Sequence, residues 1–165
     1  MARSLVPRPE VADMEINLVL HLPRDVTSVP VSRQVLDGCL ETLGVTPDTR
    51  ADIALAISEA CANVVQHAGP GEEYQVQVSA GDGRCVIEVV NTGSGAGDAR
   101  IALNREPVPP TAEHGRGLKI IDAVVENLQL RSNQYQGTIV HFEKTLEWLP
   151  GAAGQYLFNA NDGQA

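Results

Sequence analysis

The first hydrophobic pattern in the chain is an alternation of apolar and polar residues over residues 14–22. A two-residue period is typical of a β-strand with one buried face. We therefore predict a strand that ends at Pro23. From Ser28 to Leu43 the apolar residues recur at helical spacing, with Pro30 in the first turn and Gly44 where a left-handed stop is expected. This second pattern predicts an amphipathic helix.

Another helix is predicted from the Thr-Pro-Asp run at residues 46–48, which supplies an N-cap, a first-turn proline and an early acid, to His67. Inside it Glu59, Asn63 and His67 recur every four residues among small and apolar side chains. Because a helix turns about 100° per residue, the three side chains lie along one edge. A carboxylate and an amide one turn apart suit a pocket in which one group orients or deprotonates a nucleophile and the other holds a hydrated cation. The alternative is that all three form the solvent face of the helix.

The remaining patterns predict a hairpin, a long loop, a further helix and two more strands. Residues 74–80 alternate and residues 85–90 are mostly apolar, so the Gly-Asp-Gly run between them predicts a β-hairpin. Residues 91–113 have no periodicity, and a loop of that length in a compact domain is usually functional or mobile. The elements expected after it are a helix marked by Leu118 to Leu128, a strand over 128–132 and a strand over 138–144.

The length of 165 residues allows one domain with a proper core. We expect a flexible leader over residues 1–13, one domain over 14–147 and a poorly ordered, turn-rich tail over 148–165. No stretch has the length and apolar character needed to span a bilayer, which predicts neither secretion nor membrane insertion.

Charge and cysteine content indicate which class of partner and which cellular compartment to expect. A formal charge of −9 and a pI near 4.8 argue against direct nucleic-acid binding, which needs clustered Lys and Arg. Cys39, Cys61 and Cys85 lie far apart in apolar runs, so we interpret them as small core residues in a reducing compartment. The predicted localisation is the cytoplasm.

Three glycines, Gly93, Gly95 and Gly97, follow the apolar strand in the run NTGSGAGD. Without Cβ atoms they let the backbone fold tightly and approach a flat ligand closely. An ordinary flexible loop is the equal alternative for this segment alone.

A second glycine pair, Gly115 and Gly117 in EHGRGLKII, opens a helix. The unpaired N–H groups and the positive dipole end of a helix start favour an anion. Arg116 and Lys119 add positive charge there, or are simply solvated first-turn side chains. The spacing matches neither the Walker nor the Rossmann glycine motif.

Taken in order, four motifs resemble the N, G1, G2 and terminal glycine boxes of the histidine-kinase-like ATPase (GHKL, or Bergerat) superfamily. They are Glu59 with Asn63, the NTGSG run, HGRGL, and Gly137 with Thr138. The resemblance covers about residues 14–144, and the short form with SEACANVVQHA and HGRGLKII is most similar to the bacterial anti-sigma-factor serine/threonine kinases. It implies an α/β (α+β) two-layer sandwich, in which helices cover one face of a mixed, mostly antiparallel sheet.

The resemblance also implies roles for individual residues. Glu59 would be the general base or water-orienting carboxylate, and Asn63 would reach the Mg²⁺ bound to the ATP phosphates. Residues 98–113 would form a lid, and His67 matches a position where a ligand role and a packing role are both open. The residues implied to contact ATP are Asn63, Asn91, Gly93, Gly95, Gly115, Arg116, Gly117, Leu118 and Thr138.

One residue departs from the family pattern. The G1 box normally opens with Asp, whose carboxylate accepts from the adenine amino group, and this chain has Asn91. An amide still offers a carbonyl oxygen but lacks the charge, which is worth on the order of 1 kcal/mol in a hydrogen bond. Asn91 therefore leaves open an altered nucleotide affinity or base preference, or a scaffold that has kept only protein binding.

The function implied is an ATP-binding anti-sigma factor and serine kinase that sequesters a sigma factor and phosphorylates an anti-anti-sigma antagonist. Its expected cofactors are ATP and Mg²⁺, and a homodimer is open. The main alternative is a non-catalytic protein-binding module on the same fold. A detached histidine-kinase ATPase domain is disfavoured, because no dimerisation helix pair precedes residue 14.

Overall fold

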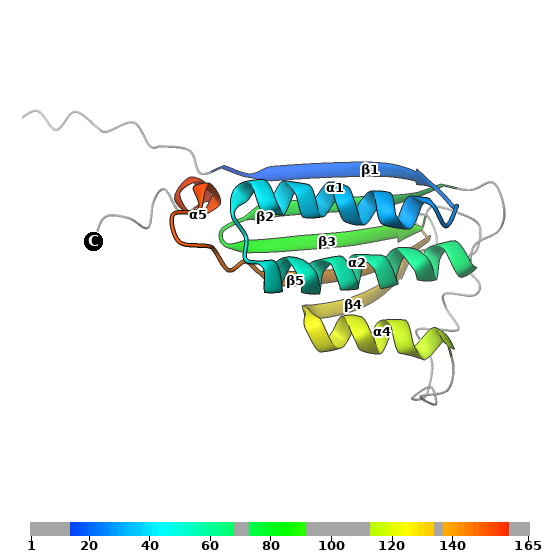
Figure 1. Cartoon of the computed structure of the whole chain (residues 1–165). Helices are drawn as coiled ribbons and strands as arrows, with labels where there is room; N and C mark the ends of the chain where they lie inside the picture. The colour runs from blue at the N-terminus through cyan, green and yellow to red at the C-terminus, as the bar shows by residue number, and fades with distance from the viewer. Residues whose placement is uncertain (1–13, 68–72, 92–112, 134–136, 159–165) are drawn as a thin grey trace, which may run out of the picture.

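The computed structural model describes residues 14–67, 73–91, 113–133 and 137–158 (Figure 1). Within these ranges the chain forms helices and strands close to those predicted. In chain order they are β1 (Ile16–Pro23), α1 (Ser28–Leu43), α2 (Pro47–His67), β2 (Glu73–Gly81), β3 (Arg84–Asn91), α4 (Glu113–Val124), β4 (Glu126–Asn133), β5 (Gly137–Thr145) and α5 (Ala153–Phe158).

The strands form one five-stranded sheet in the order β1-β2-β3-β5-β4. All four pairings between these strands are antiparallel. Helices α1, α2 and α4 lie side by side over one face of the sheet (Figure 1). The predicted α+β two-layer sandwich with a mostly antiparallel sheet is thus confirmed.

The core lies between the helices and the sheet. The two-residue period of β2 buries every second side chain, Tyr74 to Ala80, and β3 buries Cys85, Ile87 and Val89 toward the same side. Helix α2 contributes the stripe Ile53, Ala56, Ile57, Ala60, Cys61 and Val64. Cys61 and Cys85 are core residues as predicted, whereas Cys39 is half-buried. Within the described ranges, no helix is long and apolar enough to cross a membrane.

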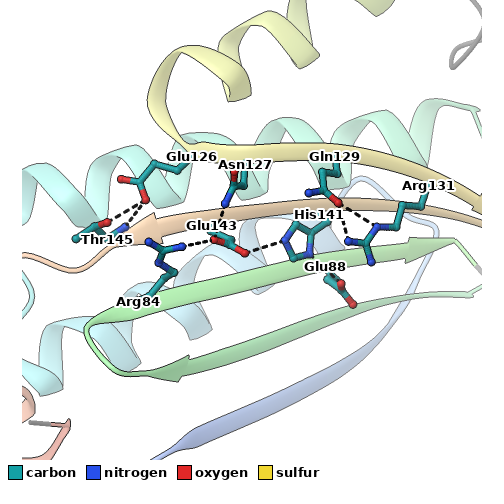
Figure 2. Close-up of polar contacts among 9 residues, drawn as sticks. All are labelled: Arg84, Glu88, Glu126, Asn127, Gln129, Arg131, His141, Glu143 and Thr145. Carbon is teal, nitrogen blue, oxygen red and sulfur yellow. Dashed lines mark hydrogen bonds and ion pairs between the residues drawn. The ribbon is translucent and has the colours of Figure 1, made fainter.

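The opposite face of the sheet carries a network of polar side chains (Figure 2). The imidazole of His141 lies between two carboxylates, with Nδ1 2.9 Å from Glu88 Oε1 and Nε2 3.2 Å from Glu143 Oε1. Glu143 Oε2 also accepts hydrogen bonds from Asn127 at 3.0 Å and from Arg84 at 2.7 Å. These contacts, the bond from Asn127 first, lower the pKa of Glu143 below its usual value.

The third long helix is shorter than its apolar spacing predicts. Helix α4 ends at Val124, and Leu128, which continues the helical spacing, lies instead in strand β4. Asn127, which has a left-handed φ of 49°, lies in β4 at the register irregularity between Glu126 and Gln129. Asparagine adopts this conformation more easily than most residues, so a local irregularity of the strand overrides the longer helical periodicity.

The expectation of a poorly ordered tail over 148–165 is wrong for residues 148–158. Trp148 and Phe158 stack with ring centroids 5.7 Å apart, and Phe158 is only 1% exposed. Gly154 allows this contact, because a Cβ there would lie 2.2 Å from the Trp148 ring. Two aromatic side chains thus bury enough apolar surface to order a segment whose composition is turn-rich. Residues 159–165 and the leader 1–13 lie outside the described residues.

Candidate functional site

Those predicted site residues that the structure describes lie toward one end of the molecule. The C-terminal ends of α2 and β3, the N-terminal end of α4 and the start of β5 all lie at this end (Figure 1). Glu59 and Asn63 belong to α2, and Gly117 belongs to α4. Asn91 is the last residue of β3, and Thr138 is the second residue of β5.

Gly117 contacts the polar pair on α2. A Cβ atom at Gly117 would lie 3.0 Å from Asn63 Nδ2, 3.2 Å from Asn63 Oδ1 and 3.3 Å from Glu59 Oε2. Only a residue without a side chain leaves these carboxylate and amide groups undisturbed beside the backbone of α4. The structure therefore brings the polar edge of α2 and the first turns of α4 into direct contact.

The positions of Glu59 and Asn63 on α2 determine how far their side chains are buried. Its apolar stripe faces the sheet and is fully buried, while Leu55 on the other side is 42% exposed. Glu59 and Asn63 lie between these two faces and are half-buried. They are thus not the fully exposed face of an amphipathic helix, which was the alternative for these two residues.

Helix α4 begins at Glu113, so the HGRG run forms its first turns. The N–H groups of this first turn have no partner within the helix and point outward, beyond its N-terminal end. Gly117 is buried and Leu118 packs against the core, whereas Arg116 and Lys119 are exposed. This geometry offers backbone donors and two nearby cations to an anion.

Asn91 and Thr138 are direct cross-strand neighbours of β3 and β5. Asn91 also pairs with Tyr74 of β2, whose hydroxyl lies 2.7 Å from Ser28 Oγ on α1. Paired residues of antiparallel strands share a face, so Asn91 and Thr138 are on the helix side of the sheet. The hydroxyl of Thr138 is buried and has no hydrogen-bond partner among the described residues. A buried hydroxyl of this kind is suited to a ligand group.

A contact not expected from the sequence involves Asn91. Arg24, just after β1, donates a hydrogen bond from Nη2 to Asn91 Oδ1. The two residues are 67 positions apart in sequence, and they meet because Leu22, Tyr74 and Asn91 form one row across β1, β2 and β3. No local spacing in the sequence points to Arg24.

Tyr74, the middle residue of this row, carries a buried polar group. Tyr74 is fully buried and its hydroxyl contacts Ser28, while Ser32 Oγ lies 3.6 Å from Cys61 Sγ. Burial raises the pKa of Tyr74 to about 12, so its hydroxyl keeps its proton. These contacts hold the start of α1, and hence the segment around Arg24, against α2 and β2.

Several predicted site residues cannot be placed. Gly93, Gly95, Gly97 and lid residues 98–112 lie outside the described residues, as does the side chain of His67. Glu113, the last residue of the expected lid, is the first residue of α4. Gly115 lies in the first turn of α4.

Residues 22–144 match the family model described as histidine kinase-like ATPase domain. The serine-protein kinase RsbW of Bacillus velezensis is 27% identical over 123 residues, which cover 69% of this chain and 77% of the relative. RsbW of Bacillus cereus strain AH820 is 27% identical over 126 residues, with 70% and 77% covered.

A crystal structure of the RsbU and RsbW domains of Rv1364c from Mycobacterium tuberculosis superposes with a TM-score of 0.59 at 21% identity. The match covers 79% of this chain and 32% of the mycobacterial chain. At this identity the likeness concerns the fold.

Proposed function

The chain belongs to the histidine kinase-like ATPase domain family, and we propose that it binds Mg²⁺-ATP and phosphorylates a serine of a partner protein. The observation that carries the proposal is the contact of Glu59 and Asn63 with Gly117 at the start of α4. It brings a carboxylate and a potential cation ligand beside the first turns of α4, where backbone N–H groups have no partner within the helix.

The described residues fit a nucleotide with its cation. The first-turn amides of α4 would hold the phosphates, and the absence of a side chain at Gly117 lets Glu59 and Asn63 lie directly beside α4. The unpaired Thr138 hydroxyl and the Asn91 amide would face the base. Within the described ranges, no group of three or more His, Cys, Asp or Glu side chains could hold a metal ion. Asn63 would therefore bind Mg²⁺ together with phosphate oxygens and water, which is how this ion is usually held.

Glu59 and Asn63 have separate roles in the proposed reaction. Mg²⁺-ATP supplies the phosphoryl group and the charge that neutralises it during transfer. Glu59 accepts the proton of the attacking serine hydroxyl, and the amide oxygen of Asn63 orients the cation. Both side chains are half-buried, which would limit their motion and hold them beside the start of α4.

The proposed partners are a sigma factor, which the chain would sequester, and an anti-anti-sigma antagonist, which it would phosphorylate. The resemblance of the motifs to anti-sigma-factor kinases supports both partners, and the two relatives named as serine-protein kinases support the phosphorylation of a protein. The net charge of −9 suits a protein partner better than a nucleic acid. The proposed setting is the cytoplasm, and the proposal includes a possible homodimer.

A second candidate is a non-catalytic protein-binding module on the same fold. Asn91 favours it, because the Asp expected there is absent and the amide oxygen already accepts a hydrogen bond from Arg24. The two candidates differ in whether Mg²⁺-ATP stabilises the protein.

The test measures thermal unfolding with and without Mg²⁺-ATP, followed by transfer of labelled phosphate to candidate antagonists. The wild-type midpoint is expected to rise with ligand concentration, because ligand binds only the folded state. Glu59→Gln is expected to keep that rise and to lose about 100-fold or more in phosphotransfer rate. Glu147→Gln, at an exposed position, is the matched control. An unchanged midpoint at millimolar Mg²⁺-ATP would reject the kinase in favour of the binding module.

A further inference from the structure

Helices α2 and α4 pack against each other and run in opposite directions (Figure 1). Gly117 of α4 lies beside Glu59 of α2. Asp52 comes seven residues before Glu59 on α2, and Val124 comes seven residues after Gly117 on α4. Because seven residues make almost two helical turns, each pair lies on one side of its helix, about 10 Å apart. The antiparallel packing therefore brings Asp52 opposite Val124.

Lys144 joins the two helices at this second point. It lies on the helix-facing side of β5, with the strand parity of the buried residues Val140 and Phe142. Its Nζ atom donates to the carbonyl oxygen of Val124 at 2.6 Å and to Asp52 Oδ2 at 2.9 Å. The Lys144 side chain is 18% exposed, so water competes little for these bonds. Helix α4 is thus attached to α2 both near its start and at its end.

The C-terminal end of α4 requires a cation from another element. The last carbonyl groups of a helix have no partner within it and form the negative end of its dipole. The last described turn of α4, residues 121–124, has no basic side chain and includes Asp122. The carbonyl oxygen of Ile121 accepts from Val125 N at 3.1 Å, whereas that of Val124 accepts from Lys144. Lys144 therefore supplies both the donor and the charge.

The attachment at Val124 affects the geometry at Gly117. A helix is stiff over two turns, so a tilt or slide at the end of α4 moves the backbone near its start. A Cβ atom at Gly117 would lie only 3.0–3.3 Å from the Asn63 amide and the Glu59 carboxylate, so small shifts change this contact. Misplacement by about 1 Å is enough to weaken a site of this kind.

We propose that Lys144 is a positioning residue for the nucleotide site. It holds α4 in register with α2, and thereby keeps the first-turn amides of α4 beside Glu59 and Asn63, without touching the nucleotide itself. This inference rests on the proposed binding of Mg²⁺-ATP and adds the residue that aligns the two halves of that site.

The test is titration calorimetry of Mg²⁺-ATP into the full chain, at a temperature where circular dichroism shows every variant folded. Lys144→Met keeps an unbranched side chain and removes the donor and the charge. Its Kd is expected to rise about tenfold, the equivalent of one hydrogen bond to the phosphates. Lys144→Arg, which restores a cationic donor, is expected to recover most of the affinity. Asp52→Asn removes only the charge on α2 and is expected to raise the Kd about threefold.

Phe158→Ala is the control for a general loss of stability. Phe158 is buried in α5, at the end of the molecule opposite the first turns of α4 (Figure 1). Its truncation is expected to destabilise the chain more than Lys144→Met and to leave the Kd within about twofold of wild type. NMR of the nucleotide-free chain gives a second readout. The Gly117 backbone amide and the Asn63 side-chain amide are expected to shift in Lys144→Met and not in Phe158→Ala.

The outcomes separate the role of Lys144 from the function beneath it. Wild-type affinity in folded Lys144→Met would overturn the positioning role and leave the proposed function intact. Equal weakening in Phe158→Ala would assign the effect to stability and also overturn the role. If Lys144→Met does not fold, wild-type affinity in Asp52→Asn overturns it. A wild-type chain that does not bind Mg²⁺-ATP would overturn both proposals.

Discussion

The Nζ atom of Lys144 lies 2.6 Å from the carbonyl oxygen of Val124, the last residue of α4. The same Nζ lies 2.9 Å from Asp52 Oδ2 on α2. A lysine on the sheet thus ties the far end of α4 to α2, and the near end of α4 meets Glu59 and Asn63. The ammonium group also complements the negative end of the α4 dipole.

Lys144→Met is therefore expected to lower the free energy of unfolding by about 1–3 kcal/mol, the cost of removing a charged donor that is 18% exposed. Asp52→Asn, which keeps the bond to Val124, should have the smaller effect, because Asp52 is 39% exposed. Urea unfolding of both variants measures the difference. Equal losses would assign the stabilisation to the ion pair and not to the end of α4.

Gly117→Ala is expected to separate stability from activity. The new Cβ would crowd Asn63 and Glu59 at 3.0–3.3 Å and displace both side chains. Alanine also favours a helix by about 1 kcal/mol over glycine, so the unfolding free energy should not fall. If the proposed kinase activity is correct, phosphotransfer should fall at least tenfold, because the proposed catalytic groups lose their positions.

Gly38→Ala in α1 is the control for this variant. A Cβ at Gly38 meets nothing within 4 Å, so only the helix propensity changes. We expect added stability and unchanged phosphotransfer. If Gly117→Ala behaves like Gly38→Ala, the contact with α2 has no functional role.

Phe158→Ala tests the packing of α5. Phe158 is 1% exposed and stacks on Trp148, so the truncation should cost about 3–5 kcal/mol. Tyr156→Ala, at a side chain that is 68% exposed, should stay within about 0.5 kcal/mol of wild type. Thermal and urea unfolding report both values. Similar small losses for the two variants would mean that α5 is not part of the cooperative fold.

Glu143 is expected to make the fold sensitive to acid. Its pKa is lowered from 4.5, first by the hydrogen bond from Asn127 and then by His141 and Arg84. A carboxyl whose folded pKa is lowered stabilises the protein above its unfolded pKa, and that stabilisation is lost as the pH falls through the folded pKa. Glu143→Gln should thus flatten the stability profile below about pH 4.5. Urea unfolding from pH 3 to pH 7, with Glu147→Gln as control, measures this slope.

The elements best predicted from sequence have strong local signals. The bounds of α1 are those expected, and the predicted stop at Gly44 has a left-handed φ of 85°. The four-residue spacing of Glu59 and Asn63 and the glycines of the HGRG run identified the surfaces of α2 and α4 that meet. Four-residue repeats and glycines are local features of the sequence, and their structural effect can be predicted without knowledge of the tertiary fold.

Contacts between residues far apart in the sequence were harder to predict. Arg24 meets Asn91 only through the strand order, and nothing near Arg24 in the chain indicates it. Lys144 did carry a signal, since it has the strand parity of the buried residues Val140 and Phe142 and so faces the helices. The stacking of Trp148 on Phe158 was not predicted, because the glycines between them indicated a poorly ordered segment.

The backbone hydrogen bond from Met14 N to Leu157 O, 2.9 Å long, joins the start of β1 to the end of α5. Both lie at the end of the molecule opposite the first turns of α4 (Figure 1). A short linker between these two points would close the domain into a ring, so circular permutation should preserve its core. A fluorescent reporter attached at either point would likewise stay clear of the α2–α4 contact.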